Sequence, residues 1–230
     1  MSLLELHRAF LAVTVDRLAA DERVAAVVLT GSGGRGEADE WSDLDINVMA
    51  DDDQSEALLS CAESAEEYGD LAVWVDCSFN APPKGAMTFA RYLVGDDLVL
   101  VDWHVWPLAL ARLTAGASIL WARPELQLAP FDGTVVDLTS SQTLRTIPPY
   151  SRQQRAEWEL CMLQIAASRP ARRQDASAIG AHLGLTFPSG SSAAEQLDVL
   201  HRHLDELQPW VAPRAWKATR RRLDAVAATL

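Results

Sequence analysis

Two acidic side chains, Asp43 and Asp45, stand two positions apart in a segment, residues 43–48, in which polar and apolar residues alternate. This alternation predicts a half-buried β-strand, in which residues i and i+2 point to the same face. The two carboxylates should therefore lie side by side, where they repel each other unless a cation or another partner compensates. Hard oxygen ligands suit magnesium, and two such ions roughly 3.5–4 Å apart can activate a hydroxyl and stabilise a leaving pyrophosphate. We predict that Asp43 and Asp45 bind divalent metal.

A glycine-rich stretch, residues 31–36 with the sequence GSGGRG, precedes these acids. Glycine lets the backbone approach a ligand closely, and N–H groups at the start of a short helix can bind phosphate oxygens. Ser32 adds a hydroxyl, and Arg35 adds a guanidinium that can bind a phosphate in a forked geometry. We predict that Gly31, Ser32 and Arg35 contact phosphate groups of a ligand.

The same stretch formally satisfies G-x-G-x-x-G, with acids at 51–53 about 20 residues further on, as in dinucleotide-binding folds. Such a fold needs a crossover of a dozen or more residues between parallel strands, but only six residues separate Gly36 from Asp43. The phosphate-loop ATPase pattern also fails, because no Gly-Lys-Ser/Thr is present. We exclude both.

A third acid has two candidates, Asp76 in residues 73–77 and Asp102 in residues 100–104, each central in an apolar, strand-like segment. A lone acid in such a strand costs several kcal/mol unless it is paired or binds metal, so both need a partner. His104 follows Asp102 by two residues and shares its face. It either serves the site or only satisfies a buried hydrogen bond.

The pattern Gly31-Ser32-x-x-Arg35-Gly36, then five residues, then Ser42-Asp43-x-Asp45 resembles the active-site signature of the DNA polymerase β-like nucleotidyltransferase superfamily, especially its aminoglycoside-modifying branch. Residues 95–107, a turn, a strand with an acid and then a proline, resemble a later segment of aminoglycoside adenylyltransferases. A helical C-terminal domain is also typical of that branch.

This resemblance implies a magnesium-dependent enzyme of the EC 2.7.7 type that transfers AMP, or another nucleoside monophosphate, from ATP or another nucleoside triphosphate to a small molecule's hydroxyl. It implies that Asp102 is the third acid, with Asp76 as the alternative, and that Asp102 joins one of two magnesium ions and acts as base. The nucleotide-binding residues that it implies are Gly31, Ser32, Arg35 and Ser42. The resemblance implies that the acceptor is an aminoglycoside-type antibiotic and that the enzyme has a role in antibiotic resistance. The acidic N-terminal half would concentrate such a polycation.

Two other functions stay open. An antitoxin-like nucleotidyltransferase would bind or modify a partner protein and should expose a large apolar patch on its helical half. A non-catalytic nucleotide-binding module is the second, although the intact Asp-x-Asp speaks against it. The sequence sets no oligomeric state.

The elements that position these residues predict an α+β fold. Helical spacing and a Ser2/Glu5 capping box predict a helix over 3–20, and further patterns predict a buried strand at 24–30, a helix at 52–68, and strands at 71–79 and 92–106 with a turn at 95–97. Helices opened by Ser151/Gln154, Ser192/Glu195 and Pro213, with a weaker one at 175–184, predict a bundle. We therefore expect a nucleotidyltransferase domain over 1–148, a mixed β-sheet flanked by helices, and an all-α domain over 149–230 that binds the acceptor or acts as a lid.

Composition narrows the setting. The chain has 230 residues, of which 49% are hydrophobic and 23% charged, as in ordinary globular proteins. Its net charge of −12, −15 in residues 1–150 and +3 in 151–230, argues against nucleic acid as the partner. No apolar run reaches the roughly 18–20 residues of a membrane span, and no secretory signal is evident, so we expect a cytoplasmic protein. The three widely spaced cysteines indicate neither disulfides nor a zinc site.

Overall fold

The computed structural model of the chain describes residues 2–52, 69–141, 146 and 149–230. The chain divides into two compact units, one of residues 1–94 and 99–148, the other of residues 95–98 and 149–230. The helix predicted at 52–68 lies, apart from Asp52, outside the described residues. No helix in the described ranges is long and apolar enough to cross a membrane.

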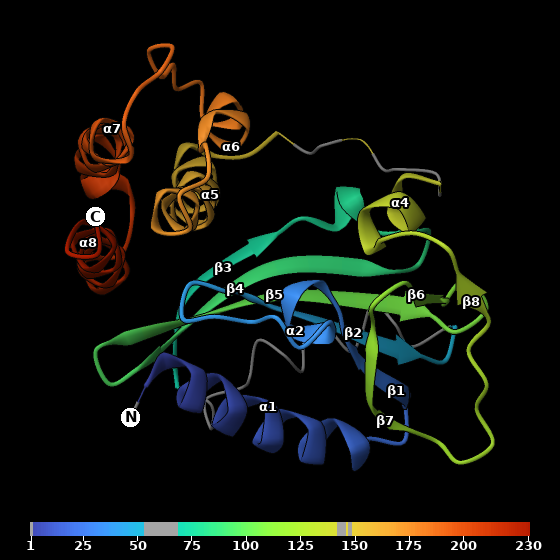
Figure 1. The fold of residues 1–230 in the computed structure, drawn as a ribbon. Coiled ribbons are helices and arrows are strands. Elements are labelled where there is room, and N and C mark those ends of the chain that lie inside the picture. Colours follow the sequence, from blue (N-terminus) through green and yellow to red (C-terminus); the bar gives the residue numbers. More distant parts are fainter. Residues whose placement is uncertain (1, 53–68, 142–145, 147–148) are drawn as a thin grey trace. The chain divides into compact units, whose positions relative to one another are not determined.

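The first unit is built on a six-stranded mixed sheet in the order β3-β4-β5-β2-β1-β7 (Figure 1). The strands are β1 (Val24–Leu29), β2 (Leu44–Ala50), β3 (Asp70–Asp76), β4 (Ala86–Val94), β5 (Asp97–Pro107) and β7 (Ser118–Ala122). β2 and β5 run parallel, whereas β1 is antiparallel to both β2 and β7, and β3 is antiparallel to β4. Two short strands, β6 (Leu113–Thr114) and β8 (Pro130–Phe131), form a separate parallel pair. The predicted mixed sheet flanked by helices is confirmed.

Two helices cover opposite faces of this sheet (Figure 1). On one face lies α1 (Leu3–Ala19), which begins with the predicted capping box of Ser2 and Glu5 and packs Leu6 and Phe10 into the larger core. On the other face lies α4 (Val135–Ser140), whose Leu138 packs with Val28, Met49 and Trp106. Both faces of the central strands are therefore buried, and the expectation that β2 is only half-buried is wrong.

Side chains alternate between these faces along each strand. In β2, Leu44, Ile46 and Val48 join the core under α1, so Asp45 and Asn47 point to the α4 face with Met49. The parallel register with β5 then places Asp45 beside Asp102, Asn47 beside His104, and Met49 beside Trp106. The acids of the two strands thus share one face and one rung of the sheet.

The connection from β1 to β2 contains only one short helix, α2 (Gly31–Gly34). Because β1 and β2 are antiparallel, they cannot form the parallel crossover unit of a dinucleotide-binding fold. The exclusion of that fold from the spacing of residues 36 and 43 is confirmed.

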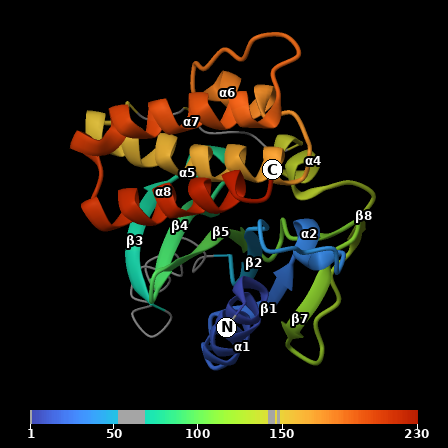
Figure 2. The same ribbon diagram turned by 60° about the vertical axis from the view of Figure 1, so that its left-hand side comes forward.

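The second unit contains four helices, α5 (Arg152–Ala171), α6 (Ser177–His182), α7 (Ala193–Leu207) and α8 (Pro213–Ala227). Capping boxes open α5 at Ser151 and α7 at Ser192, as predicted. The helices α5, α7 and α8 pack against one another around buried leucines (Figure 2). An ion pair of 3.3 Å between His203 Nε2 on α7 and Glu159 Oε2 on α5 joins two of them.

Candidate metal and nucleotide site

The centre of the candidate site is a cluster of three acids. Carboxylate oxygens of Asp43, Asp45 and Asp102 all lie within 4.8 Å of one another. Asp45 and Asp102 face each other across the β2–β5 register, and Asp43 immediately precedes β2. Asp102 is buried, whereas the other two are partly exposed. The donor set is three carboxylates, the ligand type that hard divalent cations such as Mg²⁺ prefer, so these residues fit such an ion.

The glycine turn borders this cluster on the β1 side. Gly31 has a φ of +61°, which L side chains rarely adopt, and a Cβ atom there would overlap the carboxylate of Asp45. The backbone N–H of Thr30 donates to the carbonyl of Asp45 over 3.0 Å. Glycine at position 31 is therefore required by its backbone conformation and by the acid packed against it.

A short hydrogen-bond chain fixes the loop between α2 and β2. The hydroxyl of Ser32 donates to Ser42 Oγ (3.1 Å), which donates to Asp39 Oδ1 (2.9 Å) and accepts from the Asp39 N–H (3.0 Å). Ser42 is buried, and its hydroxyl links Ser32 to Asp39. Arg35 is exposed, and its Nε forms an ion pair of 2.6 Å with Glu37.

Arg91, which the sequence analysis missed, contacts the third acid. It is fully buried, and its Nη1 donates to Asp102 Oδ1 over 3.0 Å and to the carbonyls of Ala90 and Val101. A single arginine inside an apolar run was the available signal, but the strand was predicted to begin at Tyr92, whereas β4 begins at Ala86. Arg91 supplies a buried positive charge against three negative ones.

The acids disfavour full ionisation. Burial, together with the negative charges of Asp43 and Asp102, raises the pKa of Asp45 well above its ordinary value. Burial raises the pKa of Asp102 to about 6, although Arg91 opposes the shift. A bound cation would offset this repulsion and favour the ionised carboxylates.

The alternative third acid, Asp76, lies elsewhere. The β3–β4 register pairs it with Thr88, which shares its face of β4 with Ala86 and Ala90 in the core under α1. Asp76 is therefore on the face opposite to Asp102, is exposed, and accepts a hydrogen bond from the Ser78 N–H (2.8 Å). Among the described residues, the structure brings Asp102 and not Asp76 to Asp43 and Asp45.

A buried network of polar side chains connects the strands that carry the site. Asn47 Nδ2 donates to Thr30 Oγ1 over 2.8 Å, and Trp106 Nε1 donates to Asn47 Oδ1 over 3.0 Å. Asn47 is almost fully buried, so its amide needs hydrogen-bond partners, and Thr30 and Trp106 supply them. The network ties the end of β1 to β2 and β5, the strands that position the acids and the glycine turn.

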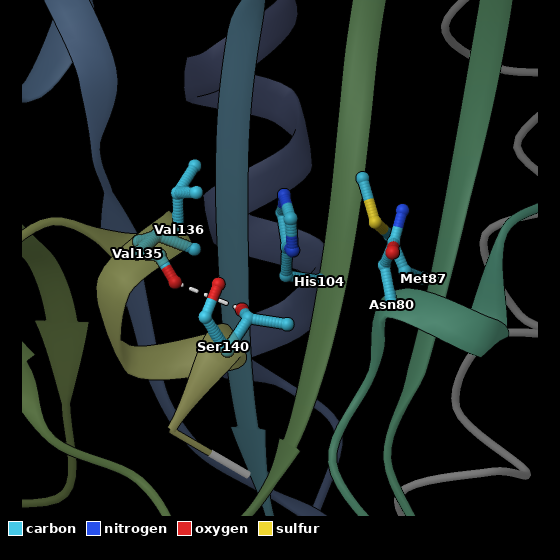
Figure 3. Close-up of a pocket in the computed structure, with 7 residues that line it drawn as sticks. Asn80, Met87, His104, Val135, Val136 and Ser140 are labelled. Carbon is cyan, nitrogen blue, oxygen red and sulfur yellow. Dashed lines mark hydrogen bonds between the residues drawn. The ribbon is translucent and has the colours of Figure 1, made fainter. Parts of the chain in front are cut away.

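His104 occupies the next rung after Asp102 and faces a cavity beside α4 (Figure 3). Burial lowers its pKa to about 4, so the imidazole is neutral at pH 7. The structure thus places His104 on the same face as the acids, as its spacing from Asp102 predicts.

Comparison with known proteins agrees with this geometry. No curated protein matches the chain. A family model described as a nucleotidyltransferase domain matches residues 12–84, which include the glycine turn, Asp43 and Asp45. The match is to the general domain, not to the aminoglycoside-modifying branch. Residues 12–84 are therefore similar to a nucleotidyltransferase domain.

Proposed function

We propose that this protein is a magnesium-dependent nucleotidyltransferase that moves a nucleoside monophosphate from a nucleoside triphosphate to the hydroxyl of a small molecule and releases pyrophosphate. The expected donor is ATP and the expected group AMP. The observation that carries the proposal is the set of three carboxylates within 4.8 Å of one another, beside a glycine turn in the matched domain.

The acids would hold the metal, and two ions are expected. Divalent metal at such a site lowers the pKa of a hydroxyl and neutralises charge on the phosphates. We assign to the carboxylate of Asp102 the proton of the attacking hydroxyl, because Asp102 belongs to the acid cluster and lies on β5, on the side of β2 away from the glycine turn. Arg91 holds this carboxylate in place through Oδ1.

The glycine turn would bind the triphosphate. Gly31 of the turn packs against Asp45, and the hydroxyl of Ser32 and the backbone N–H groups of residues 31–33 are the groups we assign to phosphate oxygens. The N–H of Gly34 donates to the Thr30 carbonyl instead. Ser42 acts through its hydrogen bond to Ser32. Arg35 would contact phosphate after exchanging its ion pair with Glu37.

We assign this chemistry to a domain of residues 1–148 and propose that residues 149–230 bind the acceptor or act as a lid. An aminoglycoside-type acceptor is supported by the resemblance and by the net charge of −15 in residues 1–150. The rival reading, a partner-binding module, gains no support. Among the described residues of 149–230, the exposed large apolar side chains are Trp210 and Leu230, and the guanidinium of Arg152 lies 3.6 Å from the Trp210 ring centroid.

The test is a mass-spectrometric screen of the purified chain with magnesium, each of the four nucleoside triphosphates, and a panel of aminoglycosides and neutral hydroxylated compounds. We expect a nucleotidylated product with the wild type and with Asp76→Asn, a matched control outside the cluster, and none with Asp45→Asn. Equal turnover by Asp45→Asn would refute the proposal.

A further inference from the structure

A cavity of about 170 Å³ lies beside the acid cluster on the α4 face of the sheet. Figure 3 shows His104 of β5 between Val135 and Val136 of α4 on one side and Met87 and Asn80 on the other. The proposed chemistry uses none of these side chains. The cavity is large enough for one six-membered ring, since an apolar cavity of about 150 Å³ binds benzene.

The cavity adjoins the acids along two strands. On β5, His104 follows Asp102 by two residues, a rise of roughly 6.6 Å on one face. On β4, Met87 and Arg91 point to this same face, and Arg91 contacts Asp102. A molecule with one group at Asp102 can therefore place its neighbouring group in the cavity.

The lining of the cavity is chemically different from the acid cluster. Among the described residues that line it there is no Asp, Glu, Lys or Arg. Met87, Val135 and Val136 are apolar, whereas Asn80, His104, Thr139 and Ser140 carry uncharged hydrogen-bonding groups. The hydroxyl of Thr139 already donates to the Val135 carbonyl over 2.8 Å. Apolar walls with a few hydrogen-bonding groups are typical of sites for uncharged rings. A polycation would lose hydration there and find no carboxylate.

The position of the cavity favours the acceptor over the nucleotide base. In the sheet, β1 and the glycine turn lie on one side of β2, whereas β5 and β4 lie on the other. In an in-line displacement the attacking and leaving groups stand on opposite sides of the phosphorus. If the phosphates bind the turn, the attacking hydroxyl approaches from the side of Asp102, where the cavity lies.

We propose that this cavity binds an uncharged, mainly apolar ring of the acceptor, so that the enzyme prefers hydroxylated acceptors bearing such a ring to polycationic ones. The inference rests on the proposed function and names the acceptor class for it. It departs from the aminoglycoside expectation, because the described lining of the cavity itself offers no counter-charge for ammonium groups.

The binding test uses the full chain labelled with ¹³C on the methionine methyl groups, with Met87 assigned through Met87→Leu. Neutral polyols that carry a phenyl ring, a cyclohexyl ring or no ring are titrated in separate samples, as is ATP with magnesium. We expect the Met87 signal to shift with the ring-bearing polyols and not with the polyol that carries no ring. No shift with any ring-bearing polyol, or a shift with ATP instead, would overturn the inference.

A variant that fills the cavity supplies the second arm. Val136 lines the cavity yet is 72% exposed, so Val136→Trp should fold, which its unfolding midpoint checks. We expect it to weaken binding of the ring-bearing polyols at least tenfold. Val13→Trp, at an exposed position of α1, is the control and should leave that binding unchanged. Equal binding by both variants contradicts the inference.

The two proposals fail differently. If the wild type modifies aminoglycosides but no ring-bearing polyol shifts the Met87 signal, the transferase assignment stands and the cavity inference is wrong. If Met87 responds to rings but no acceptor in the panel is modified, the cavity binds as inferred and the proposed function is wrong.

Discussion

Replacing Asp45 by asparagine should stabilise the metal-free protein and remove its stabilisation by magnesium. Asparagine keeps the shape of the side chain but takes one negative charge out of the cluster. The raised pKa of Asp45 means that its ionised form is disfavoured in the folded protein relative to the unfolded chain. The wild type bears this cost at neutral pH, and the variant does not.

The size of the effect follows from the geometry. Two unit charges 4.8 Å apart, the largest separation in the cluster, repel by about 3 kcal/mol at an effective dielectric constant near 20. Attraction by Arg91 and partial exposure of Asp43 and Asp45 reduce the net cost. We expect the free energy of unfolding to rise by about 1–2 kcal/mol, with about 2–4 °C in unfolding midpoint per kcal/mol.

The assay is thermal unfolding in EDTA and in excess MgCl₂, with Asp76→Asn as an exposed acid outside the cluster. The expected order in EDTA is Asp45→Asn above wild type and Asp76→Asn equal to wild type. Magnesium should raise the midpoints of wild type and Asp76→Asn only, because ligand binding to the folded state stabilises it.

The stability difference between Asp45→Asn and the wild type should depend on pH. A carboxyl group whose folded pKa is raised contributes stability below its unfolded pKa, near 3.8, and loses that contribution as the pH rises through the folded value. The advantage of Asp45→Asn should therefore be small near pH 4 and grow towards neutral pH. A variant less stable than wild type at pH 7 in EDTA, or one that magnesium stabilises as much as wild type, would refute the reasoning.

Three further variants test the supporting structure. Arg91→Met leaves the buried Asp102 without its partner, so it should cost about 3–5 kcal/mol of unfolding free energy. It should also raise the pH at which magnesium gives half of its stabilising effect. If that pH does not change, Arg91 does not have the positioning role. Gly31→Ala should lower the unfolding midpoint and abolish stabilisation by magnesium, whereas Gly36→Ala, also at positive φ but with open space around it, should show only the roughly 1–2 kcal/mol strain; equal magnesium responses would count against the packed carboxylate. Hydrogen bonding to its glutamate partner on α5 raises the pKa of His203. This pair therefore stabilises the fold fully below about pH 6.5, and its contribution fades as the pH rises through the raised pKa. In His203→Gln the unfolding midpoint should depend less on pH between about pH 6 and 8, and an unaltered pH dependence would refute the assignment.

Local signals in the sequence predicted much of this fold because their physics is local. The capping boxes at Ser2, Ser151 and Ser192 act over three residues, and all three open helices where expected. The short spacing between Gly36 and Asp43 excluded a crossover without any knowledge of the rest of the chain.

Strand pairing was not predictable in this way. Whether Asp76 or Asp102 reaches Asp45 depends on β5, and not β3, being the parallel neighbour of β2, a contact between segments far apart in sequence. The alternation in β2 was misread for a related reason. Asp45 and Asn47 suggested a solvated face. Asn47 is instead buried in the polar network of the site and shares its face with Met49, which packs with Leu138 of α4.

The two charged residues buried in apolar strands, Arg91 and Asp102, compensate each other's charge. Alone, a buried Arg91 in β4 or a buried Asp102 in β5 would cost several kcal/mol. Together they form an ion pair, and the uncompensated charge that remains in the cluster is negative, next to a turn that only glycine can make at position 31. A purely structural role would require neutrality, because excess buried charge destabilises a fold. A bound cation would compensate this surplus of carboxylates, as we propose for the site, and the stability of Asp45→Asn without metal measures the surplus directly.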